Sequence, residues 1–208
     1  MTSLAATPDP TARAEATRAR SEEAAERLFR EVGYQKTTVA DIARDLGMSP
    51  ANVYRFFPSK SAINEAIAAR MLQGLDEGCW AIARGEGPPG ERLARLMRFL
   101  HREHLAMFFA ERRLHDMVNA AMQEHWGVIE RFIRSVVEAI RHVLMDGMAT
   151  GEFGRRDPEG EAYTIKNSLM MFTHPLLVAD CIGHGATEES MAADLDRLIE
   201  FTLRALRP

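Results

Sequence analysis

The chain has 208 residues, of which 46% are hydrophobic and 27% are charged, and its formal net charge is −4. That composition is typical of a soluble protein, and the length suffices for one or two compact domains with a real core. No apolar run is long enough to cross a bilayer, and the N-terminus lacks the basic and apolar regions of a secretory signal. The only cysteines, Cys79 and Cys181, are too few for a disulfide framework. We therefore expect a cytoplasmic protein without a membrane partner.

Charge is distributed unevenly along the chain. Residues 1–60 carry nine Lys or Arg and eight Asp or Glu, which gives +1, whereas residues 61–208 carry 17 and 22, which gives −5. The difference is small, so charge alone is weak evidence for a nucleic-acid partner, and the positions of individual basic residues carry more weight.

The chain is expected to begin with a disordered arm over residues 1–13, which are rich in Thr, Ala and Pro. A first helix is predicted from Ala14 to Val32. Its apolar face comprises Ala24, Ala25, Leu28, Phe29 and Val32, and Gly33 ends it.

Two short helices are predicted within residues 38–56. Val39, Ile42, Ala43 and Leu46 recur at helical spacing, with Thr38 at the N-cap position and Asp41 three residues later as a capping-box partner. Gly47 ends this helix because glycine enters the left-handed region at little cost. Ser49 is then expected to cap a second helix that begins at Pro50, and Pro58 stops it. A fourth helix is predicted to start at Lys60.

Two helices joined by a tight glycine turn indicate a helix-turn-helix, in which the second helix enters the major groove of DNA. The side chains suit DNA contacts, since Ala51 is small, Asn52 can pair with base edges, and Tyr54 and Arg55 can reach phosphates or bases. A helical hairpin in an unrelated bundle is the competing interpretation. Arg13, Arg18 and Arg20, on the way into the first helix, fit either contacts with the DNA backbone or a solvated helix face.

A longer pattern resembles the DNA-binding signature of TetR-type transcriptional regulators. It covers roughly residues 18–75 and comprises Gly33-Tyr34, Thr37-Thr38-Val39, Asp41-Ile42-Ala43, Gly47-Met48-Ser49-Pro50, Val53-Tyr54 and Phe56-Phe57-Pro58-Ser59-Lys60. The resemblance implies that Thr38, Tyr54 and Lys60 contact phosphates while Ala51, Asn52 and Arg55 face the bases, with Ser49 and Pro50 also in the interface. The family often has Gly-Thr or Gly-Ala in place of Ala51-Asn52, and His in place of Arg55, so the operator sequence does not follow from the resemblance.

The rest of the chain is predicted to be helical. A linking helix covers 60–84, and the Gly/Pro-rich segment 85–90 is a turn. Helices then follow over roughly 93–108, 114–122 and 126–150. Asp157-Pro158 starts one long helix, in which Pro175 must introduce a kink or lie where packing compensates, and Thr187 caps the last helix. No strand-like alternation occurs, so the fold is expected to be all-α with about nine helices.

A set of Met, aromatic and His residues in the C-terminal part would serve either as plain core or as the lining of a cavity. The resemblance implies a ligand-binding C-terminal domain, and Met adapts well to variable ligands. The candidate effector pocket is Met97, His101, His104, Phe108, Trp126, Ile129, Phe132, Met171 and His174. Although His101 and His104 are spaced for a metal, no ligand motif supports one, and we expect neither metal nor cofactor. No catalytic motif is present either, so we expect no enzyme.

The sequence thus predicts a homodimeric, TetR-like regulator that acts as a repressor. Its domains would be a DNA-binding domain over 14–60, the linking helix 60–84, and an effector-binding and dimerisation domain over 91–208. Dimers are expected to form through residues 158–180 and 188–206, with Leu169 and Leu198 in the interface. The expected partners are a palindromic double-stranded DNA operator, a second copy of the chain and a small, largely apolar effector. Two other classes stay open: an all-α interaction module without DNA function, and a helical-bundle enzyme.

Overall fold

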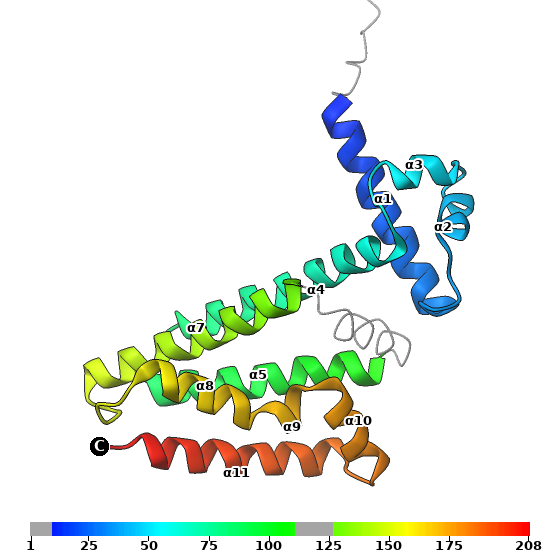
Figure 1. Ribbon diagram of the computed structural model, residues 1–208. Helices are drawn as coiled ribbons and strands as arrows, with labels where there is room; N and C mark the ends of the chain where they lie inside the picture. The colour runs from blue at the N-terminus through cyan, green and yellow to red at the C-terminus, as the bar shows by residue number, and fades with distance from the viewer. Residues whose placement is uncertain (1–9, 111–126) are drawn as a thin grey trace, which may run out of the picture. The chain divides into compact units, whose positions relative to one another are not determined.

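The computed structural model describes residues 10–110 and 127–208, and these contain ten helices and no strand (Figure 1). The prediction of an all-α fold is confirmed. Within these two ranges, no helix has both the length and the apolar character that crossing a bilayer requires. The predicted helix near 114–122 and residue Trp126 lie outside the described residues.

The chain divides into two compact units, Met1–Ala68 and Ala69–Pro208, and the division falls inside helix α4 (Lys60–Ala83). The first unit contains α1 (Pro10–Glu31), α2 (Val39–Asp45), α3 (Pro50–Tyr54) and the first turns of α4. Helix α1 packs against α2, which packs against α3. Fully buried side chains from all four helices meet in one small core, among them Ala25, Phe29, Ile42, Ala43, Val53, Ile63 and Ile67.

Helix α1 starts earlier than the sequence predicts. It begins at Pro10, so residues 10–13, which were expected to belong to the arm, are helical. Proline is tolerated in the first helical turn, where its missing N–H has no intrahelical acceptor. Pro10 therefore begins the helix and does not mark an irregular segment.

The second unit is a bundle around α5 (Pro89–Ala110). Helix α5 lies between α7 (Gly127–Thr150) and α11 (Glu188–Leu206) and contacts both (Figure 1). Its apolar face supplies Leu93, Leu96, Met97 and Leu100 to the core, where they meet Ile140 and Leu144 from α7 and Leu195 and Ile199 from α11. Gly151 follows α7 with a positive φ of 79°, and Thr187 caps α11, as predicted, by accepting a hydrogen bond from the N–H of Ser190.

The single helix expected after Asp157 is instead three helices, α8 (Pro158–Ser168), α9 (Met170–Thr173) and α10 (Pro175–Gly183). Asp157 caps α8 as predicted, accepting hydrogen bonds from the N–H groups of Glu159 and Gly160. His174 has an extended backbone, with φ −80° and ψ 121°, because the ring of the following proline disfavours the helical region. Pro175 therefore starts a new helix and does not kink an existing one.

Leu169 and Leu198, which were expected at a subunit interface, contact the core of a single chain. Leu169 is only 2% exposed, and Leu198 packs partly buried against the same core. Other apolar residues of these helices are exposed, among them Tyr163 (45%), Leu176 (51%) and Phe201 (63%). The apolar periodicity identified these segments as helical, but it did not distinguish the face that packs inward from the face that remains open.

Candidate DNA-binding interface

Helix α2 is held at its start by a capping box, as the sequence predicts. The Thr38 hydroxyl accepts a hydrogen bond from the N–H of Asp41 at 3.2 Å, and the Asp41 carboxylate accepts one from the N–H of Thr38 at 2.9 Å. Hydrogen bonds from the Thr38 side chain and backbone, with the nearby positive charge of Arg44, lower the pKa of Asp41 below its ordinary value. Val39, Ile42 and Ala43 anchor the helix to the core.

The turn between α2 and α3 depends on Gly47, whose φ of +65° lies in the left-handed region. The N–H of Met48 then bonds the carbonyl oxygen of Ala43 at 2.9 Å, which closes the turn. Pro50 occupies the first position of α3, as predicted. Ser49 sits at the N-cap with extended backbone, but its hydroxyl makes no capping bond. Thus Pro50 and the turn geometry, and not a serine cap, define the start of α3.

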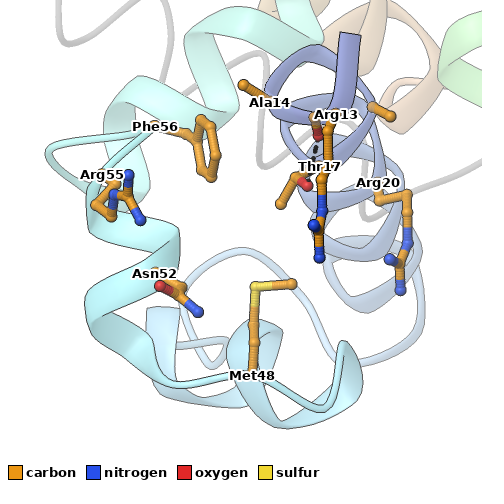
Figure 2. A pocket seen from close by; sticks show the side chains of 9 residues that line it. Arg13, Ala14, Thr17, Arg20, Met48, Asn52, Arg55 and Phe56 are labelled. Carbon is orange, nitrogen blue, oxygen red and sulfur yellow. Dashed lines mark hydrogen bonds between the residues drawn. The ribbon is translucent and has the colours of Figure 1, made fainter. Parts of the chain in front are cut away.

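Helix α3 is short, and one residue anchors it. Val53 is fully buried, and Phe57, just beyond the helix, is 2% exposed beneath the guanidinium of Arg18, which lies 5.3 Å from its ring centre. The opposite side of the helix is open. The predicted contact residues Thr38, Ser49, Pro50, Ala51, Asn52, Tyr54 and Arg55 are all exposed. Figure 2 shows that the side chains of Asn52 and Arg55 point from α3 into the space between α3 and α1.

Lys60, whose ammonium the sequence analysis places on a DNA phosphate, makes a contact within its own domain. Its Nζ donates a hydrogen bond to the carbonyl oxygen of Tyr34 at 2.8 Å, and it lies 4.3 Å from the centre of the Tyr34 ring. Tyr34 is itself 4% exposed and packs edge-on against Phe29. Sequence reasoning missed this contact, because 26 residues separate the partners and no local pattern connects them.

The candidate effector residues do not form one set. Met97 is fully buried in the core, Ile129 and Phe132 are partly buried, and Met171 is 48% exposed. Met171 lies in the one-turn helix α9, and helical spacing alone did not predict that its side chain is exposed. Phe108 and Trp126 are residues whose side chains lie outside the described part of the structure.

Three histidines of the candidate set remain of interest. His101 is 4% exposed, and its Nδ1 lies 3.0 Å from the carbonyl oxygen of Phe172. Within the described residues, neither its Nε2 nor the buried Nδ1 of His174 has a hydrogen-bond partner. The Nδ1 of His104 lies 2.6 Å from the carbonyl oxygen of Leu100. Burial, reinforced by the nearby His101, lowers the pKa of His104. No group of His, Cys, Asp and Glu suited to a metal ion occurs in the described ranges.

Both units match known protein families. Residues 23–67 match the bacterial regulatory proteins of the tetR family, and residues 89–194 match the tetracyclin repressor-like C-terminal domain. An uncharacterized HTH-type transcriptional regulator, YhgD of Bacillus subtilis (strain 168), is 25% identical over 149 residues, which are 69% of this chain and 75% of that protein.

Solved structures agree with this assignment in their fold. A TetR-family transcriptional regulator from Pectobacterium atrosepticum has a TM-score of 0.69 and 22% identity, with 96% of this chain and 98% of that chain covered. SmeT, the repressor of the multidrug efflux pump SmeDEF of Stenotrophomonas maltophilia, has a TM-score of 0.66 and 19% identity, with 92% and 91% covered. With an exposed recognition helix in the first unit and family matches over both units, the chain belongs to the TetR family of transcriptional regulators.

Proposed function

We propose that the protein is a repressor that binds a palindromic DNA operator in the cytoplasm as a homodimer and is released by a small, largely apolar effector. The observation that carries the proposal is the two-sided character of α3. Val53 fixes one side of it in the core, and the other side exposes Ala51, Asn52 and Arg55. A small residue flanked by an amide and a guanidinium suits direct readout of base edges in a major groove. The proposal gives the protein no catalytic role.

Specific roles follow from the chemistry of these side chains. Asn52 would pair with the N6 and N7 edge of an adenine, and Arg55 with the O6 and N7 edge of a guanine. Thr38 and Tyr54 carry exposed hydroxyls that suit phosphate oxygens, and Ser49 and Pro50 place the start of α3 close to the backbone. Lys60 is assigned a structural role instead, because its ammonium is bonded to Tyr34.

Selection of duplexes from a random pool tests the DNA-binding part of the proposal. A palindromic sequence is expected to be enriched, and Asn52→Ala should weaken binding to it by about 1–3 kcal/mol while relaxing preference at one base pair. Gln35→Ala is the matched control, because Gln35 is exposed in the same unit but outside α3. An equal loss for Asn52→Ala on the selected and on a shuffled duplex would contradict the assigned role of α3.

The effector would bind beside α5 and α7, near Met97, Ile129, Phe132 and the three histidines. The chemistry of His101 narrows the ligand class. A carbonyl oxygen only accepts hydrogen bonds, so the His101 Nδ1 facing Phe172 carries the proton, and Nε2 of the neutral ring is an acceptor. This buried acceptor lacks a partner among the described residues, and an unmade bond is costly. We therefore propose an apolar effector that bears a hydroxyl donor.

A pair of probes tests this ligand class. Propylphenol is expected to raise the melting temperature more than propylbenzene, which has the same apolar part without the donor. His101→Phe should remove the difference, and Met171→Ala, at an exposed site, should preserve it. Equal stabilisation by both probes, or a preference for propylbenzoate, would rule out a hydroxyl contact at His101.

A further inference from the structure

A groove of about 540 Å³ lies within the first unit, between the N-terminal half of α1 and helix α3 (Figure 2). Arg13, Thr17 and Arg20 border it on the α1 side, and Asn52 and Arg55 border it on the α3 side. Half-buried Met48 and Phe56 contribute an apolar surface. The groove therefore shares two residues with the DNA-reading face of α3 but extends beyond it onto α1.

The charge in this groove is entirely positive. None of the nine residues that line it is acidic, and three are arginines. Among the described residues, no carboxylate pairs with any of these three. Four other arginines of the same unit each have a carboxylate partner: Arg18 with Glu22, Arg27 with Asp45, Arg30 with Glu26 and Arg44 with Asp41. The arginines of this unit that have no carboxylate partner among the described residues thus all border the groove.

We propose that the groove holds the sugar–phosphate backbone of the DNA strand that borders the major groove occupied by α3. This inference rests on the proposed DNA-binding function and adds α1 to the DNA-contacting surface. Arg13 and Arg20 are seven residues apart, so they lie two turns apart on one face of α1, about 10 Å along its axis. Successive phosphates of one strand advance about 3.4 Å along the duplex, so guanidiniums this far apart can contact different phosphates of one strand.

Exposure favours a polyanion over a small anion as the occupant. Arg13, Arg20 and Arg55 are all exposed, so no desolvated charge is present to hold a single small ion against water. A DNA backbone gains instead from the release of condensed counterions, which exposed arginines can drive. Met48 and Phe56 suit the apolar edge of a deoxyribose. The Thr17 hydroxyl donates to the carbonyl oxygen of Arg13 at 2.8 Å, so its proton is already used and the arginines supply the contacts.

Salt titration of DNA binding tests the groove, with a duplex selected from a random pool by the wild-type protein and a shuffled duplex of the same length. The double variant Arg13→Gln/Arg20→Gln should reduce the slope of log affinity against log salt by about 1.8 per half-site, since each phosphate contact contributes about 0.9. The loss should be equal on both duplexes, because phosphate contacts carry no sequence information.

Two control variants isolate the groove. Arg27→Gln removes one positive charge from α1 on the side that faces Asp45, and it should leave the slope unchanged. Arg13→Lys/Arg20→Lys keeps the charge and should keep the slope. Circular dichroism should give equal melting temperatures for wild type and the Arg13/Arg20 variants, because both side chains are exposed and lack an ion-pair partner among the described residues.

Three results would overturn the inference. One is a wild-type slope for the double Gln variant. Another is an equal reduction by Arg27→Gln, which would show a general charge effect. The third is a double Gln variant that no longer binds dodecanoate, an anionic amphiphile that the wild type binds, while its salt slope on DNA is unchanged. The groove would then be a small-molecule site. Failure of the proposed function looks different, because the wild-type protein would then enrich no duplex from the pool.

Discussion

The ammonium of Lys60 lies 2.8 Å from the carbonyl oxygen of Tyr34 and 4.3 Å from the centre of the Tyr34 ring. This contact joins the first residue of α4 to the segment between α1 and α2. Since Tyr34 packs against Phe29 of α1, a single side chain links three parts of the helix-turn-helix unit. Lys60 therefore supports the position of the recognition helix from within the domain.

Replacement of Lys60 by Met is expected to destabilise the first unit. A hydrogen bond from a charged group contributes about 1.5–3 kcal/mol and a cation–π contact about 0.5–1 kcal/mol, so we expect a loss of about 2 kcal/mol. Faster amide hydrogen exchange in residues 29–45 of the Lys60→Met variant would show this loss of stability. Tyr54→Phe is the control, because the hydroxyl of Tyr54 is at the surface. Unchanged exchange together with a salt slope lower by about one per half-site would instead place Lys60 on a phosphate.

Phe201→Glu is expected to produce monomers. Phe201 is 63% exposed on α11, and its apolar side chain would be covered by a second copy of the chain in the dimer. A buried, unpartnered charge at the interface should weaken association by about 3 kcal/mol, roughly two orders of magnitude in the dissociation constant. Sedimentation equilibrium measures this. Met145→Glu introduces the same charge at a 47% exposed site on α7 and should leave the dimer intact. A wild-type dissociation constant for Phe201→Glu would exclude this face.

The thiol of Cys79 is expected to resist alkylation in the folded protein. Burial, reinforced by the negative charge of Asp76, raises the pKa of Cys79 to about 12 from an ordinary 9.0, so the thiol stays protonated at neutral pH. The partly buried Cys181 should react first, as mass spectrometry after iodoacetamide treatment would show. Because the unfolded thiol ionises at lower pH than the folded one, this group's contribution to stability is complete below pH 9 and is lost as pH rises toward 12. Modification of Cys79 ahead of Cys181 in native buffer would contradict the expected resistance of Cys79 to alkylation.

Two helical glycines should respond in opposite ways to alanine. At Gly147 of α7 an added Cβ would lie 2.1 Å from the Phe153 ring, which is 4% exposed and has little room to move. Gly147→Ala should therefore cost about 1–3 kcal/mol through overpacking. At Gly74 of α4 nothing lies within 4 Å of the added atom, so Gly74→Ala should stabilise the protein by up to about 1 kcal/mol. Denaturant unfolding compares the two, and equal effects would refute the packing argument.

The sequence by itself determined the helix-turn-helix in detail. Thr38 and Asp41 cap each other across three residues, Gly47 supplies a left-handed turn, and Pro50 starts the next helix. All of these interactions lie within a few residues, so they can be read before anything is known of the tertiary structure. The same holds for the Asp157 and Thr187 caps, and the family resemblance rests on this local stretch as well.

Only the tertiary structure decided which faces meet. Periodicity identified apolar residues in α8, α9 and α11, but packing determined that Leu169 points into the core while Met171 and Phe201 remain exposed. Likewise, no local pattern connects Lys60 with Tyr34, or the arginines of α1 with Arg55 at the end of α3. Such contacts depend on how separate helices cross, and the crossing is set by the shapes of whole side-chain surfaces, because a helix of given periodicity can pack in several orientations.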